Sequence, residues 1–178
     1  MPLHEPVLVA DVTTELPTEG MLYLELSQRT QEALNDIPFS HVAQRFYDVM
    51  NAKIGQLEPH RVDIARLFAN AMQTEELHGI FAQDAMAQVF VDIVERSTDA
   101  PNRPEDVAGL AHLLYALYLL TVLFWLYDRT PQRTATAHLL DFTREMIRLL
   151  RPMMIMPMFA RALTKVSAIV TMLFRLPR

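Results

Sequence analysis

The apolar positions of this chain recur every three or four residues from residue 18 onward, which is the spacing of one face of an α-helix. No stretch alternates between apolar and polar positions for long enough to predict a β-sheet. The pattern predicts an all-α fold, a single bundle of six or seven helices over residues 17–178. Residues 1–16 contain one short β-like piece, PVLVADV, with no clear partner, and we expect an irregular arm there.

Proline and capping residues set the expected boundaries of the helices. Pro104, Glu105 and Asp106 predict a strong helix start, because acidic side chains suit the positive end of the helix dipole. Thr130 and Pro131 predict a cap and a first-turn proline for the next helix. With the other Pro, Gly and capping positions, the expected helices cover about 18–34, 40–57, 59–72, 86–94, 104–127, 132–151 and 158–174.

The segment 107–127 is the most unusual feature of the sequence, because its 21 residues carry no charge. At about 1.5 Å per residue it would span roughly 31 Å, which is enough to cross the apolar core of a bilayer. His112 and a weakly apolar first turn argue against a membrane span, and so do the polar faces of the preceding helices. The alternatives are a core helix and a contact with a second copy of the chain.

Dimerisation is the interpretation that accounts for two neighbouring helices at once. A helix that is apolar all round must be covered all round. The segment 132–150 also carries more apolar side chains than one stripe would need. We therefore expect a homodimer with a four-helix contact between 107–127 and 132–150 of each subunit. The expected interface residues are Leu123, Phe124, Tyr127, Leu139, Phe142, Met146 and Leu150.

Composition and charge narrow the classes of protein. The chain has no cysteine, and its N-terminus does not have the pattern of a secretory signal, so we expect a cytoplasmic protein. Residues 1–128 carry 7 Lys and Arg against 19 Asp and Glu, a net charge of −12, whereas residues 129–178 have a net charge of +7. The basic part could attract nucleic acid or anionic lipid, or it could balance the acidic part within one domain.

Sequence motifs for catalysis are missing. The six histidines show no metal-ligand spacing, and the four glycines form no phosphate-binding loop. We therefore expect neither an enzyme nor a cofactor or metal site.

Three stretches resemble a known family of regulators. They are LPTEGMLYLEL (16–26), LEPHRVDIARLF (57–68) and LFWLYDRTPQRTATAHLL (123–140). They resemble the effector-binding and dimerisation region of tetracycline-repressor-like (TetR-family) transcription regulators, over about residues 16–150. The resemblance implies a ligand-sensing bundle and a ligand cavity among the helices of residues 40–127.

The sequence departs from that family before residue 16. Family members carry a three-helix DNA-binding domain ahead of the connecting helix, and MPLHEPVLVADVTTE contains neither two helices nor a Lys or Arg. A helix-turn-helix needs two helices, one of which enters the DNA groove, and Lys or Arg side chains that contact the phosphates. The chain is then either a truncated regulator or a sensing module without DNA binding of its own. In both cases we expect it to take a hydrophobic small molecule.

The candidate lining of the cavity is aromatic and rich in methionine, as is typical of apolar ligand pockets. Phe81 belongs to this group, and His112 would be its polar contact. Side chains of these types at helical spacing also form ordinary cores, so both interpretations stay open. The expected ligand-binding residues are Phe46, Met50, Phe68, Met72, Met86, Phe90, His112, Tyr115 and Tyr118.

The C-terminal segment 158–178 combines apolar bulk with basic residues and no acid. It could lie on anionic lipid, or it could pack on the bundle with Arg161 and Lys165 reaching water. We expect this segment to pack on the bundle. If the regulator interpretation is wrong, the alternative is a membrane-associated or purely protein-interaction helical protein.

Overall fold

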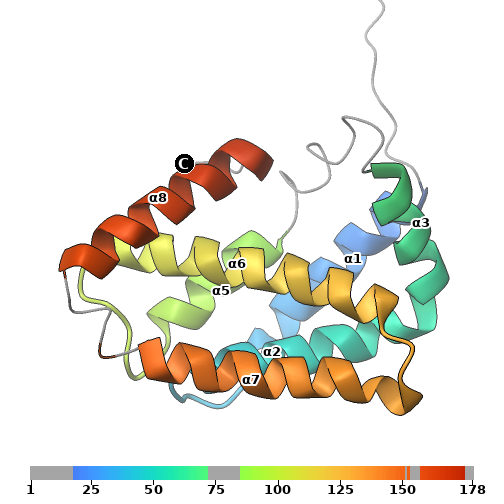
Figure 1. Ribbon diagram of the computed structural model, residues 1–178, viewed down its shortest axis with the longest axis horizontal. Helices are drawn as coiled ribbons and strands as arrows, with labels where there is room; N and C mark the ends of the chain where they lie inside the picture. The colour runs from blue at the N-terminus through green and yellow to red at the C-terminus, as the bar shows by residue number, and fades with distance from the viewer. Residues whose placement is uncertain (1–17, 72–84, 151, 153–156, 175–178) are drawn as a thin grey trace, which may run out of the picture.

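The computed structural model describes residues 18–71, 85–150, 152 and 157–174 (Figure 1). These residues contain helices and no strand, so the expectation of an all-α fold is confirmed. The arm expected at 1–16 and Met72 lie outside the described residues. The helices are α1 (Thr18–Glu32), α2 (Val42–Leu57), α3 (Arg61–Ala71), α5 (Met86–Glu95), α6 (Pro104–Tyr127), α7 (Thr134–Leu150) and α8 (Pro157–Phe174).

Helix α6 occupies the centre of the bundle. It packs against α5 and α2 on one side and against α8 along the opposite side of its N-terminal half (Figure 1). Helix α7 runs antiparallel to α6 and packs mainly on α2. The buried positions of α7 are Thr136, Leu140, Thr143 and Ile147, which repeat every three or four residues and form the seam with α2.

Gly109 allows α8 to approach α6 closely. A Cβ atom at this position would lie 3.1 Å from the Cβ of Leu163, which is one of the buried residues of α8. The missing side chain of Gly109 therefore sets the distance between the two helices. The C-terminal helix therefore packs on the bundle through α6, as expected. Arg161 and Lys165 are exposed, also as expected.

Two helix starts differ from the sequence expectation. Helix α2 begins at Val42 and not at residue 40, and its first N–H donates to Asp99 Oδ1 at 2.8 Å, so the cap comes from a distant loop. Pro131 opens a 3-10 turn (Pro131–Arg133), and α7 begins only at Thr134. Gln132 and Arg133 have positive φ angles of 52° and 56°, which break the helix expected from residue 132.

The predicted Thr130–Pro131 start is present: Thr130 precedes the 3-10 turn that Pro131 opens, and its hydroxyl accepts a hydrogen bond from the Ala135 N–H at 3.0 Å. Asp128 adds a second cap for α7. Its carboxylate accepts hydrogen bonds from the backbone N–H and the hydroxyl of both Thr130 and Thr136, at 2.6–2.8 Å. The side-chain bonds from Thr130 and Thr136 are the largest cause that holds the pKa of Asp128 well below its ordinary value. The carboxylate therefore stays ionised and fixes the direction in which α7 leaves the corner.

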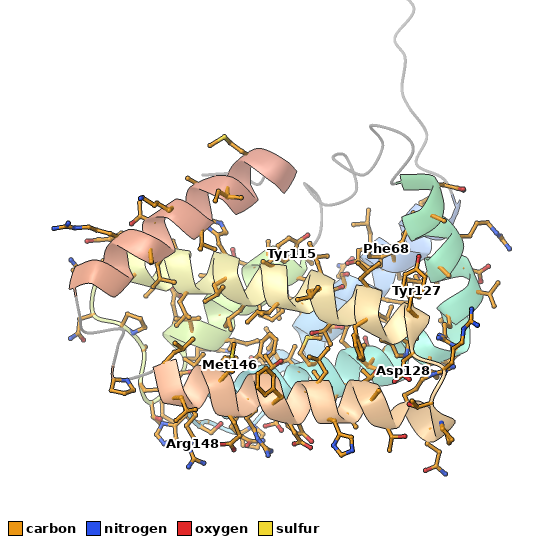
Figure 2. The ribbon with its side chains drawn as sticks, in the orientation of Figure 1. Phe68, Tyr115, Tyr127, Asp128, Met146 and Arg148 are labelled. Atoms are coloured by element: carbon orange, nitrogen blue, oxygen red, sulfur yellow. The ribbon has the colours of Figure 1, made fainter. Side chains whose placement is uncertain are left out.

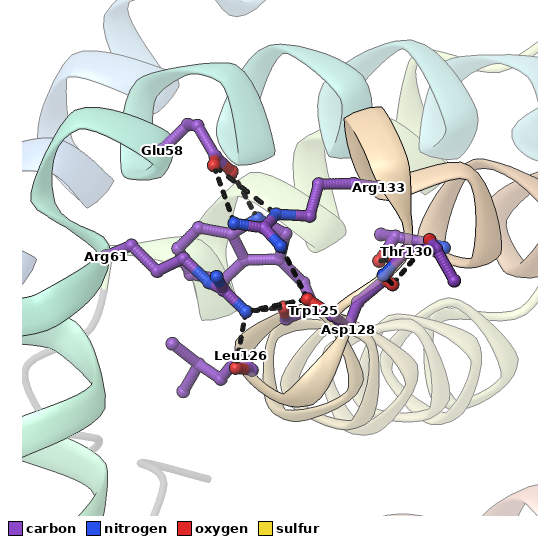
Figure 3. A network of polar contacts seen from close by, with 8 residues as sticks. Glu58, Arg61, Trp125, Leu126, Asp128, Thr130 and Arg133 are labelled. Atoms are coloured by element: carbon purple, nitrogen blue, oxygen red, sulfur yellow. Dashed lines mark hydrogen bonds and ion pairs between the residues drawn. The ribbon is translucent and has the colours of Figure 1, made fainter.

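A polar network joins α2, α3 and α6 at the same corner (Figure 3). The Arg61 guanidinium donates to the carbonyl oxygens of Trp125, Leu126 and Asp128, which are groups that a helix C-terminus leaves without a helical partner. The indole N–H of Trp125 donates to Glu58 at 2.6 Å, and Arg133 bridges Glu58 and the Asp128 carbonyl. We refer to Glu58, Arg61, Trp125, Asp128 and Arg133 as the corner network.

Candidate ligand-binding core and dimer face

Most of the residues predicted to line a cavity lie together in the core. Phe46 and Met50 come from α2, Phe68 from α3, Met86 and Phe90 from α5, and Tyr115 and Tyr118 from α6; Phe68 is 8% exposed and the others are fully buried. Phe90 is central, with ring centroids 5.8, 6.4 and 5.7 Å from those of Phe46, Tyr115 and Tyr118. We call these residues the aromatic core. Those from α2, α5 and α6 pack between these three helices, whereas Phe68 packs against Tyr23 of α1. Phe68 and Tyr115 are labelled in Figure 2.

His112 does not share this position. It is half-buried on the flank of α6, and burial lowers the pKa of its imidazole. The neutral form is therefore favoured. Phe81 lies outside the described residues, as does Met72.

A polar cluster sits beside the aromatic core, and three of its four members were missed by the sequence analysis. Tyr23, Ser27, Lys53 and Tyr118 are all completely buried, and they come from α1, α2 and α6. The Lys53 ammonium donates to Ser27 Oγ at 3.0 Å and lies 5.4 Å from the centroid of the Tyr23 ring. The hydroxyls of Tyr23 and Tyr118 share a hydrogen bond of 2.6 Å. We call these four residues the buried polar cluster.

One signal in the sequence could have identified Lys53. The buried positions of α2 include Phe46, Met50 and Leu57, and Lys53 lies in the same stripe, four residues before Leu57 and three after Met50. A lysine on the apolar face of a helix is uncommon, because burying a charge is unfavourable unless other groups compensate for it. Tyr23 and Ser27 carry no comparable signal, since both residue types occur on either face of a helix.

The outer face of α6 is covered in one half of the helix and exposed in the other. Its N-terminal half is covered by α8, whereas the C-terminal half exposes large apolar side chains: Leu120 is 59%, Phe124 41% and Tyr127 73% exposed. Helix α7 exposes Phe142 (61%), Met146 (37%) and Leu149 (72%). We call these six residues the apolar face; Figure 2 labels Tyr127 and Met146.

The remaining predicted interface residues border this face. Leu123, Leu139 and Leu150 are half-buried. Sequence reasoning missed Leu120 and Leu149, because the spacing of apolar residues on a helix that is apolar all round does not indicate which of them neighbouring helices will cover.

A groove of about 460 Å³ lies between the start of α2 and the C-terminal part of α7. Its lining mixes His41, Arg144 and Arg148 with Asp99 and Glu145. Arg144 is paired with Asp141, and Asp99 caps α2, so these groups already have structural roles. We therefore place the candidate ligand site in the core and not in this groove.

Helix α6 is the only described helix long and apolar enough to cross a membrane, with a mean hydropathy of 2.0 over its most apolar window. Half of that window is buried inside the bundle. Within the described ranges no group of three or more His, Asp or Glu side chains could hold a metal ion.

Comparisons with protein-family models, with curated proteins and with solved structures gave no match.

Proposed function

We propose that the chain is the ligand-sensing and dimerisation domain of a TetR-like transcription regulator, which binds a hydrophobic small molecule in its core and pairs with a second copy through its apolar face. One observation carries this proposal. Helix α6 contributes Tyr115 and Tyr118 to the buried core and Phe124 and Tyr127 to the apolar face. A rigid helix with both roles transmits a shift on one side to the other.

The size of the apolar face suits a stable dimer. Its six side chains are on average a little over half exposed. With roughly 200 Å² for a large apolar side chain, they present about 700 Å² per subunit, and a standard interface needs about 800 Å² per partner. Leu123, Leu139 and Leu150 would supply further area at the border of the face.

The charges beside this face favour a second copy as the partner. A two-fold contact brings the same patch of both subunits together, so the patch must complement itself. Helix α7 carries Asp141 and Glu145 together with Arg144 and Arg148 on one flank, and these side chains already pair within one subunit. A flank with both signs can face its own copy without net repulsion.

The proposed mechanism is a shift between two arrangements of the dimer. A ligand among the aromatic side chains of α2, α5 and α6 would favour one position of α6 over another, and only such differential binding can shift the equilibrium. The corner network ties the end of α6 to α3 and to the start of α7. A displaced α6 would therefore change the angle between the helices of the apolar face.

Ligand binding is tested by titrating the purified chain with 1-alkanols and alkanoates of six to fourteen carbons. Trp125 is the only tryptophan of the chain and lies fully buried in the corner network, so its emission reports movement of α6. We expect at least one chain length to change this emission and to raise the Tm. In Phe68→Ala the affinity should change, because Phe68 packs against Tyr23 with ring centroids 6.1 Å apart. No response in either protein would contradict the proposal.

A membrane-associated function is the second candidate, and the outer side of α8 favours it. Arg161 and Lys165 are exposed there together with Ile169 (61%) and Met172 (75%). Such a combination is typical of helices that lie on anionic lipid. Co-sedimentation with vesicles of phosphatidylcholine and phosphatidylglycerol separates the candidates: loss of binding in the double variant Ile169→Ser, Met172→Ser would favour the membrane function, and no binding by the unchanged chain would exclude it.

A further inference from the structure

We infer that the chain has a ligand site outside its core, which holds the phosphate group of an aromatic phosphate monoester between Arg45 and Arg96. The site is an open pocket of about 430 Å³. It lies between the 3-10 turn Ala33–Asp36 that follows α1, the loop from this turn to α2, and the end of α5. It shares no residue with the aromatic core, so the inference goes beyond the proposed function and does not depend on it.

Arg45 is the feature that distinguishes this pocket. It comes from the first turn of α2 and is only 3% exposed, although it lines the pocket. Its Nη1 donates to the carbonyl oxygens of Ile37 and Pro38, which ties the loop to α2. Its Nε is buried and donates to no group of the described residues. A guanidinium carries five N–H groups in one plane, so holding the loop uses only part of its capacity to donate.

A second guanidinium lies on the same pocket. Arg96 directly follows α5, is exposed, and donates through Nη1 to the amide oxygen of Asn35 at 2.9 Å. Burial lowers the pKa of Arg45, and the positive charge of Arg96 lowers it further. The two like charges therefore repel each other across the pocket, and an anion held between them would replace this repulsion with charge-assisted hydrogen bonds.

The carboxylates near the pocket leave room for such an anion. In the part of the chain that the structure describes, both guanidinium groups donate to neutral oxygen atoms, and neither forms an ion pair. Asp48 acts on Arg45 through its charge, but its carboxylate accepts a hydrogen bond from Gln44 at 2.8 Å. Asp36 lines the pocket and is exposed. A phosphate monoester carries about −1.5 to −2 charges at pH 7 and three acceptor oxygens, so it suits two guanidinium groups better than a carboxylate does.

The pocket also has a place for the aromatic part of the ligand. Phe39 lines it and is 71% exposed, so its ring can stack on an aromatic ligand. Leu34, Ile37 and Pro38 add apolar surface to the same pocket. The volume falls within the range of about 300–1,000 Å³ that is usual for small-molecule sites.

Isothermal titration of the full chain at pH 7 with 1-naphthyl phosphate and with inorganic phosphate tests this inference. A charge-assisted hydrogen bond corresponds to an affinity difference of roughly 10-fold or more, so Arg96→Ala should bind both anions about 10-fold more weakly. The matched control is Arg148→Ala, which removes another exposed arginine and the same charge from the groove beside α7. This control should bind both anions as the unchanged chain does.

Two further variants test the parts of the site separately. Phe39→Ala should weaken 1-naphthyl phosphate by about 2- to 10-fold and leave inorganic phosphate unchanged, because it removes the stacked ring alone. Arg45→Lys keeps the charge but removes the planar fork, so it should weaken both anions. If circular dichroism shows that this buried variant does not fold, Arg96→Ala still decides, since Arg96 is exposed.

The inference is overturned if 1-naphthyl phosphate does not bind the unchanged chain, or if Arg96→Ala and Arg148→Ala bind it equally well. Equal affinity of Phe39→Ala and the unchanged chain for 1-naphthyl phosphate would overturn the assignment of an aromatic ligand. None of these outcomes bears on the proposed function, because the alkanols and alkanoates that test the core carry no phosphate.

Discussion

Replacing Phe142 by glutamate should separate the dimer without disturbing the fold of the subunit. Phe142 is 61% exposed on α7 and contributes to the apolar face. A charged side chain at such a position remains hydrated in the monomer, and surface substitutions of this kind change the free energy of unfolding by no more than about 0.5 kcal/mol. In the dimer the same glutamate would lie inside the contact.

The magnitude follows from the exposed area. With roughly 200 Å² for an aromatic side chain, Phe142 presents about 120 Å² to a partner. At about 25 cal/mol per Å², the loss is at most about 3 kcal/mol per subunit. A two-fold contact contains the substitution twice, so the dissociation constant should rise by up to about 10⁴-fold.

Sedimentation velocity measures this change directly, because the monomer has a mass of 20.4 kDa and the dimer twice that. The unchanged chain should sediment as a dimer at micromolar concentration and Phe142→Glu as a monomer. The matched control is Val62→Glu on α3, where the replaced side chain is 73% exposed but lies outside the apolar face. A monomeric unchanged chain, or the same mass for Phe142→Glu and the unchanged chain, would refute the reasoning.

Four further predictions concern stability, each measured by urea unfolding followed by circular dichroism. Gly55→Ala should raise the free energy of unfolding by about 0.5–1 kcal/mol, because a Cβ there meets nothing within 4 Å and alanine favours the helix. Gly109→Ala should lower it by up to about 2 kcal/mol, because the new Cβ crowds Leu163; a gain equal to that of Gly55→Ala would contradict the close packing of α8. Phe90→Ala should cost about 3–5 kcal/mol, since Phe90 is fully buried, whereas Phe39→Ala at a 71% exposed position should stay within about 0.5 kcal/mol; equal effects would show that Phe90 is not in the core. Asp128 should make the chain sensitive to acid: its pKa is lowered in the folded state, so its contribution is complete above the ordinary value of 3.8 and is lost as the pH falls below it. Asp128→Asn should reduce this dependence between pH 4 and 2, and an unchanged pH profile would mean that the carboxylate does not act as the cap.

The aromatic core shows how far the sequence can lead. Phe46, Phe90 and Tyr118 were predicted to face one interior, and the structure brings them together there. Phe46 and Phe90 could be placed there because each lies on a helix whose apolar spacing indicates one buried side, which is not true of Tyr118 on α6. Lys53 was missed for the opposite reason, since a charged residue is assigned to the surface unless its helical position is considered first.

The corner of α6 and α7 shows the limit of local reasoning. Thr130 and Pro131 have the local pattern of a helix start, and Thr130 accepts the Ala135 N–H as that pattern predicts. The second cap, Asp128, and the contact of Arg61, from another helix, with the carbonyl groups at the end of α6 were not predicted. Contacts of this kind join residues far apart in the sequence. Their spacing along the chain therefore carries no signal.

The spacing of apolar side chains and the local caps are enough to predict that the chain is helical and approximately where most of its helices begin and end. The same spacing predicts that α6 needs cover on all sides. Which part of α6 is covered depends on how the helices pack in the tertiary structure. Helix α8 approaches at Gly109 and covers the N-terminal half, and the C-terminal half exposes Leu120, Phe124 and Tyr127. The covered half is set by which helices pack against each other, and the spacing of apolar residues on a helix that is apolar all round does not indicate this.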